Sequence, residues 1–165
     1  MNRKLKRIMF FTLALGMIFT MQLSVVVNTR LFITEVHALS DDADKLSSLE
    51  LETSDGNNVD IYEDCDYEDK LSNDLYVGDI YFAKTVADDI ELKSIGGASK
   101  NNVRIFIGDS DKAYKVGDEI RLSKGGATIL KVRVYEEEYN EDKCYSSSTY
   151  NPYMVIVKNT AEVGE

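Results

Sequence analysis

Tyrosines, cysteines and carboxylates are the side chains through which this 165-residue chain can bind a ligand or do chemistry. The tyrosines concentrate near the C-terminus, where Tyr145 is followed closely by Tyr150 and Tyr153 in the segment SSSTYNPY. Tyrosine offers a large amphipathic contact area at a low cost in conformational entropy. We therefore predict that these three tyrosines contact a protein or glycan partner. The alternative is a plain structural role, because tyrosine is also favoured as a strand residue.

The chain has two cysteines, Cys65 and Cys144. Outside the cytoplasm, two cysteines in a small domain most often form a disulfide. Such a bond would close a loop of about 80 residues and stabilise the fold by about 4 kcal/mol in the chain-entropy model. Neither cysteine belongs to a Cys-x-x-Cys motif, so redox catalysis is not expected. We predict a Cys65–Cys144 disulfide, with two free thiols or an intermolecular bond as the alternatives.

Acidic clusters provide the other candidate sites. The pair Asp88-Asp89 and the run Glu136–Glu138 are material for glycosidase chemistry, which needs two carboxyl groups at a defined separation. The clusters 64–66 and 109–111 hold oxygen ligands of the kind that calcium prefers, but the chain lacks the EF-hand pattern. Solvated acids are the simpler interpretation, so we predict no catalytic residue, no metal site and no cofactor.

The first 27 residues predict where the protein works. Basic residues at the N-terminus (Arg3, Lys4, Lys6 and Arg7) precede the uncharged, largely apolar stretch Ile8–Val27. This pattern directs a chain to a membrane and places the rest of the chain outside the cytoplasm. The segment Val36-His37-Ala38 fits a signal-peptidase site, which makes residues 1–38 a signal peptide. The apolar stretch is also long enough to span a bilayer, so a retained anchor is the alternative.

Removing this leader changes the composition of the working part. The leader holds five of the 19 basic residues, one of the 29 acidic residues and the single histidine, His37. The remainder has 14 bases and 28 acids, and no histidine for a Ser-His or Cys-His pair or for a zinc site. The negative field disfavours nucleic acid, anionic lipid and phosphate polymers. We expect membrane contact only through a retained N-terminal anchor.

Alternation of apolar and polar residues dominates the chain from Leu75 onward. Short segments rich in β-branched and aromatic residues are separated by Gly, Asp and Asn turns every 8–15 residues. The expected strands lie in segments 75–84, 89–95, 102–107, 119–123, 127–139 and 153–159. Their most regular member, 127–139, places Leu130, Val132 and Val134 on one face and Lys131, Arg133 and Tyr135 on the other. The chain is therefore expected to be all-β, an antiparallel sandwich or barrel of about seven to eight strands behind an N-terminal apolar leader helix. Residues 75–165 are expected to be its β-rich core. Residues 39–74 are expected to be an acidic, partly flexible segment with two weak strands.

These observations favour a secreted or cell-surface protein without enzymatic activity. The expected function is that of an extracellular binding or adhesion module for a protein or glycan. Two alternatives are a small effector or inhibitor that masks an enzyme or receptor, and a carboxylate-dependent hydrolase. Convergent acids in a deep cleft would favour the hydrolase.

Overall fold

The computed structural model describes residues 43–71, 75–146 and 149–162. The expected leader, its cleavage site after Ala38 and the choice between signal peptide and anchor lie outside these residues. The segment Ala38–Glu165 forms one compact unit. Within the described ranges, no helix is long and apolar enough to cross a membrane.

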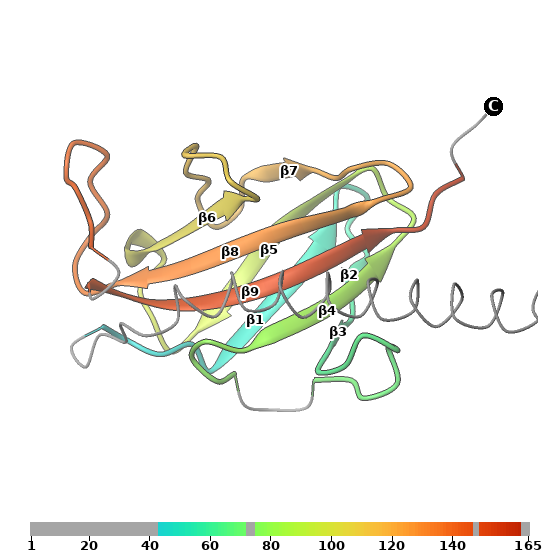
Figure 1. Ribbon diagram of the computed structural model, residues 1–165, viewed down its shortest axis with the longest axis horizontal. Helices are drawn as coiled ribbons and strands as arrows, with labels where there is room; N and C mark the ends of the chain where they lie inside the picture. The colour runs from blue at the N-terminus through green and yellow to red at the C-terminus, as the bar shows by residue number, and fades with distance from the viewer. Residues whose placement is uncertain (1–42, 72–74, 147–148, 163–165) are drawn as a thin grey trace, which may run out of the picture. The chain divides into compact units, whose positions relative to one another are not determined.

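The described residues form two β-sheets (Figure 1). The four-stranded sheet has the order β2-β1-β5-β7, and the five-stranded sheet has the order β3-β4-β9-β8-β6. A single turn of 3-10 helix, Lys100–Asn102, precedes β6. The strands are β1 (Ser48–Thr53), β2 (Asn58–Val59), β3 (Ile61–Tyr62), β4 (Ile80–Thr85), β5 (Asp89–Gly96), β6 (Val103–Ile107), β7 (Glu119–Arg121), β8 (Ala127–Tyr135) and β9 (Tyr150–Asn159).

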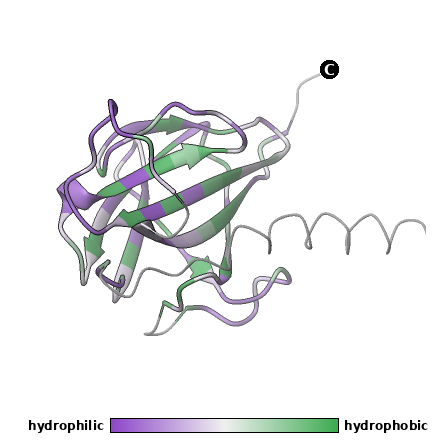
Figure 2. Cartoon of the chain, turned by 60° about the vertical axis from the view of Figure 1, so that its left-hand side comes forward, coloured by the Kyte–Doolittle hydropathy of each residue, from purple (hydrophilic) through white to green (hydrophobic). Residues whose placement is uncertain are grey.

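Alternating side chains give the two sheets a common core. Successive side chains of a strand point to opposite faces, and Figure 2 shows the resulting green and purple bands along the strands. The inward set is almost completely buried and includes residues from both sheets. Its largest buried aliphatic members are Leu51, Ile90, Leu92, Ile105, Ile120 and Leu130.

The structure confirms an all-β fold but corrects its details. Nine strands are present in the described residues instead of seven to eight. The additional strands are β2 and β3, which have two residues each and lie at the edges of the two sheets. The expectation of purely antiparallel pairing is wrong, since β4 and β9 run parallel. The 64 residues between these two strands leave ample chain for the crossover that a parallel pair requires. The expected strand at Leu75 begins only at Ile80, after a turn in which Gly78 has a φ of 91°.

Residues 43–71 of the acidic segment are an integral part of the fold. Strand β1 pairs with both β2 and β5, and β3 pairs with β4. Upstream of β1, Ala43 and Leu46 are buried. The side-chain amide of Asn151 donates hydrogen bonds to the carbonyls of Ala43 and Asp44, and the hydroxyl of Tyr153 accepts one from the Leu46 N–H. Residues 43–46 are thus tied to β9 by hydrogen bonds.

The predicted Cys65–Cys144 disulfide is not formed in the structure. Both cysteines are exposed free thiols. Cys65 lies in the loop after β3, and Cys144 lies in the loop between β8 and β9. Figure 1 shows these two loops at different ends of the five-stranded sheet. A disulfide requires Cα atoms within about 7 Å, and this arrangement does not provide it.

Reaction with a thiol reagent checks this arrangement. We expect the folded, unreduced segment Leu39–Glu165 to react with two equivalents of Ellman's reagent without denaturant, because both thiols are exposed. The Cys144→Ser variant should react with one equivalent. No reaction before reduction would show that the two cysteines are bonded.

The hydroxyl of Tyr153 provides a second test. The Tyr153→Phe substitution removes the acceptor of the buried Leu46 N–H and should lower the free energy of unfolding by about 1–3 kcal/mol. Urea unfolding followed by circular dichroism measures this change. Tyr76→Phe is the matched control, because the Tyr76 side chain is 63% exposed and its hydroxyl should contribute little. Equal stabilities of the two variants would contradict the role assigned to Tyr153.

Candidate functional site

Two arginines lie side by side on the outer face of the five-stranded sheet. Arg104 of β6 and Arg133 of β8 are directly opposite each other in the strand register. Both belong to the alternate positions that point away from the core, because their neighbours Val103 and Val134 are buried in it. Like charges at opposed positions destabilise a sheet unless other groups compensate them.

Aromatic rings surround these two guanidinium groups. The Arg104 guanidinium carbon lies 4.9 Å from the centroid of the Tyr139 ring. The Arg133 guanidinium carbon lies 4.7 Å from the centroids of both Phe106 and Tyr150. Cations above ring faces are stabilised by the negative quadrupole of the ring. The rings therefore offset part of the repulsion between the arginines.

Tyr135, at the end of β8, is the centre of the aromatic packing. Its ring centroid lies 5.0 Å from that of Tyr139, 4.5 Å from that of Tyr145 and 5.4 Å from that of Tyr150. The rings of Tyr139 and Tyr145 stack on each other at 5.2 Å. We call the group of Arg104, Phe106, Arg133, Tyr135, Tyr139, Tyr145 and Tyr150 the aromatic–arginine cluster.

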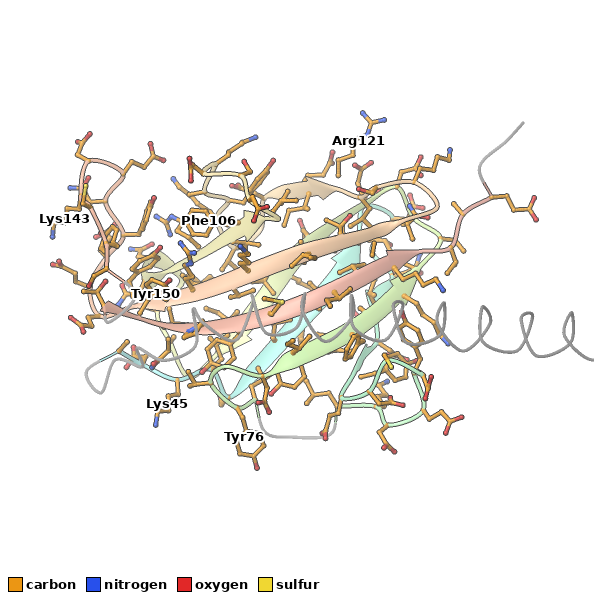
Figure 3. The ribbon with its side chains drawn as sticks, viewed as in Figure 1. Lys45, Tyr76, Phe106, Arg121, Lys143 and Tyr150 are labelled. Carbon is orange, nitrogen blue, oxygen red and sulfur yellow. The ribbon has the colours of Figure 1, made fainter. Side chains whose placement is uncertain are left out.

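Backbone hydrogen bonds fold the β8–β9 loop over this cluster. The Tyr139 N–H donates to the Asn101 carbonyl beside β6. The Asn140 N–H donates to the Tyr145 hydroxyl at 2.8 Å. These bonds fix both loop tyrosines above Tyr135, which is only 1% exposed. Figure 3 shows Phe106, Lys143 and Tyr150 at this same end of the molecule.

The three tyrosines predicted as contact residues have different environments. Tyr145 is half-buried in the cluster, with part of its surface accessible. Tyr150 belongs to the same cluster but is only 5% exposed, so it supports the surface more than it forms it. Tyr153 points into the core, is 2% exposed and binds Leu46. The structure therefore brings Tyr145 and Tyr150 together and makes Tyr153 a structural residue.

The charges around the cluster differ from those of the whole domain. Strands β4, β6, β8 and β9 contain five basic residues and no acidic residue. All five occupy outward positions: Lys84, Arg104, Lys131, Arg133 and Lys158. Strands β1, β5 and β7 of the other sheet contain five acids and two bases. The outer face of the five-stranded sheet is thus basic in a domain with twice as many acids as bases. Lys131 is paired with Asp109 at 3.4 Å.

An open concavity of about 590 Å³ adjoins the cluster. Loop residues 138–143 form one side of it, and Arg104 and Lys115 complete the lining. Apart from Tyr139, every one of these lining residues is an amide or a charged residue. The concavity therefore suits a polar ligand, with the Tyr139 ring as its aromatic surface.

The candidate catalytic carboxylates do not converge. Asp88 lies near the start of β8, where it pairs with Lys124 at 3.8 Å. The run 136–138 follows the end of β8 and is exposed. The nine residues of β8 span about 30 Å, whereas glycosidase carboxyl groups lie within about 10 Å of each other. This separation argues against a hydrolase built from these two groups.

Two of the acidic residues considered as calcium ligands, Asp64 and Asp109, have partners within the chain. Asp64 accepts hydrogen bonds from the backbone N–H groups of Glu68 and Asp69, and the fully exposed carboxylate of Asp109 pairs with Lys131. Across the described ranges, no group of three His, Cys, Asp or Glu side chains is placed to hold a metal ion.

Arg104, Phe106 and Arg133 are site residues that were not singled out from the sequence. A signal for them was present in the alternation of each strand. Arg133 was placed opposite Leu130, Val132 and Val134, and in segment 102–107 Arg104 and Phe106 alternate with Val103, Ile105 and Ile107. What the pattern lacked was the pairing of β6 with β8, which brings the two arginines together.

Comparisons with known proteins give no family for this chain. No protein-family model matches it, and neither a curated protein nor a solved structure matches it. The site is therefore interpreted from its own geometry.

The burial of Tyr135 predicts a dependence of stability on alkaline pH. Burial raises the pKa of the Tyr135 hydroxyl to about 12, although Arg133 opposes this shift. An unfolded tyrosine titrates near pH 10, so the unfolded chain loses this proton first and the fold loses stability between pH 10 and 12. A difference of two pKa units corresponds to about 3 kcal/mol.

Urea unfolding at a series of pH values measures this loss, and Tyr135→Phe should reduce it. Absorbance at 295 nm should show exposed tyrosines ionising near pH 10 and a buried group ionising later. A single ionisation step near pH 10 in a chain that is still folded would contradict the burial of Tyr135.

Proposed function

We propose that the protein is an exported β-sandwich binding module without enzymatic activity, which contacts a protein or glycan partner outside the cell. The contact surface in this proposal is the aromatic–arginine cluster together with the concavity beside it. The N-terminal leader pattern supports the location, because it directs the following domain out of the cytoplasm.

The segregation of charge is the observation that carries this proposal. Solubility depends on the net charge of the protein, which would be the same if the basic residues were scattered over the whole surface. Here four adjacent strands carry bases and no acids, and two arginines stand opposite each other in spite of their repulsion. An arrangement that costs stability and places charge on one face is typical of a surface that meets a complementary partner.

The composition of the cluster supports the same function. Tyrosine and arginine are the residue types that are enriched at recognition surfaces and at their energetic hot spots. The half-exposed rings of Tyr139 and Tyr145 are held by each other, by Tyr135 and by backbone hydrogen bonds. A surface that is already ordered loses little conformational entropy when it binds.

Substitution of the two loop tyrosines tests the proposal. The double variant Tyr139→Ala/Tyr145→Ala should bind its partner at least tenfold more weakly, because each of its two substitutions removes a ring from the centre of the surface. Binding of labelled Leu39–Glu165 to intact producing cells, and to arrays of extracellular proteins and glycans, provides the measurement. Tyr76→Ala removes an exposed tyrosine away from the cluster (Figure 3) and is the matched control.

The comparison of these two variants decides the outcome. If both bind as the unsubstituted protein does, the cluster is not the contact surface. If both variants lose binding equally, the loss is not specific to the cluster, and the assignment of the contact surface to the cluster is wrong. Circular dichroism of each variant verifies that the β-structure is retained.

A further inference from the structure

Among the residues that the structure describes, Arg104 is a buried cation without an acidic partner. Only 7% of the surface of Arg104 is exposed. Among the described residues, no carboxylate lies within ion-pair distance of it. Buried arginines are normally paired, because removing the charge from water is costly. The ring of Tyr139 compensates for only part of this cost.

The hydrogen bonds of Arg104 leave one edge of its guanidinium available. Its Nη1 donates to the carbonyls of Asn101 and Val103 at 3.1 and 2.6 Å. Within the described ranges, Nε and Nη2 have no acceptor in the chain. Only one described side-chain atom is both sealed from solvent and without a partner, the amide oxygen of Asn151. Nε and Nη2 therefore reach solvent, and Arg104 lines the concavity.

This edge has the geometry that recognises a carboxylate. A guanidinium donates two parallel hydrogen bonds to one carboxylate, and such charge-assisted pairs are among the strongest polar contacts in proteins. Lys115 also borders the concavity and adds a positive charge beside this edge. Lys143 is paired with Glu137 at 2.5 Å, and Glu138, Glu141 and Asp142 balance the three bases of the lining, so the attraction for an anion is local to Arg104 and Lys115. Nη1 is held by backbone carbonyls, so the guanidinium is already oriented before a ligand arrives.

The rest of the lining favours a sugar over a peptide. Apart from the ring of Tyr139, the concavity has no apolar side chain that would receive the apolar side chains of a peptide. Asn140, Glu141 and Asp142 supply amide and carboxylate oxygens, which accept hydrogen bonds from hydroxyl groups. A ligand that carries one carboxylate and several hydroxyls can bind the Arg104 guanidinium through the carboxylate and the loop oxygens through its hydroxyls.

We propose that the concavity binds the carboxylated sugar unit of an acidic glycan, with Arg104 donating two hydrogen bonds to the sugar carboxylate. Lys115 strengthens the attraction, and the loop oxygens orient the sugar hydroxyls. This assignment rests on the binding function proposed above and names the chemical class of the ligand. It also reverses, for one site, the expectation from net charge that anionic partners are excluded.

Binding of trigalacturonate to Leu39–Glu165 tests the assignment, with its methyl ester as the matched neutral ligand. This segment contains the whole hydrophobic core, whose buried residues lie between Leu46 and Val157. Titration calorimetry should give at least tenfold weaker binding of the ester, because it lacks the carboxylate. The Arg104→Gln variant should abolish the difference between the two ligands, and Arg104→Lys should retain part of it. Nitrogen-15 NMR shifts should change at residues 138–143 and at the Arg104 Nε.

Further variants keep the test decisive if Arg104→Gln does not fold. Lys115→Ala changes an exposed residue of the concavity and should weaken trigalacturonate binding several-fold. Lys124→Ala removes an exposed lysine near the start of β8 and should leave the binding unchanged. Equal weakening by both variants would overturn the assignment, because it would reflect net charge instead of the concavity.

Two other results would also overturn the sugar assignment. Equal affinity for trigalacturonate and its ester would remove the carboxylate from recognition. Tighter binding of tetraglutamate, with the same dependence on Arg104, would assign the site to an acidic peptide. If neither sugar binds but the tyrosine substitutions still abolish partner binding, the sugar assignment fails and the binding function stands.

Discussion

The pairing of β8 with neighbours on both sides is the constraint on which the rest of the structure depends. β8 is hydrogen-bonded to β6 along five residue pairs and to β9 along nine. Its inward residues, including Leu130, Val132 and Val134, form part of the core, so the opposite set must point outward. A shift of one residue would bury Lys131 and Arg133 and expose the aliphatic residues. The cost of burying these charges fixes the register, and the register places both arginines and Tyr135 on the same outer face.

The tyrosines show how one residue type takes different roles in one fold. In β9 the same alternation sends Tyr150 outward to the cluster and Tyr153 inward to the core. Tyr153 is buried because its hydroxyl can accept a hydrogen bond from the backbone of Leu46. This bond and those of Asn151 also hold the start of the domain against β9. Residues 43–46 are therefore built into the fold.

The sequence predicted the parts of the fold that depend on neighbours along the chain. The all-β class and the segments that became β5, β6, β7, β8 and β9 followed from alternation and turn residues, which are local signals. The parallel pairing of β4 with β9 and the separation of Cys65 from Cys144 did not follow. Both depend on which distant segments become neighbours, and one sequence carries no direct signal of that. The site was predicted in part, since Tyr145 and Tyr150 are in the cluster while its arginines come from strand pairing.

By itself, the sequence determined that this chain has a basic and then apolar N-terminal stretch, a strongly acidic remainder without histidine, and segments in which apolar and polar residues alternate. These are properties of composition and of local order, which folding does not change. Only the tertiary structure decided where the charges lie. It gathered five bases on four adjacent strands and placed Arg104 beside a concavity without an acidic partner among the described residues. Net charge sums over the whole chain, whereas a ligand meets the charges within about a Debye length of its site.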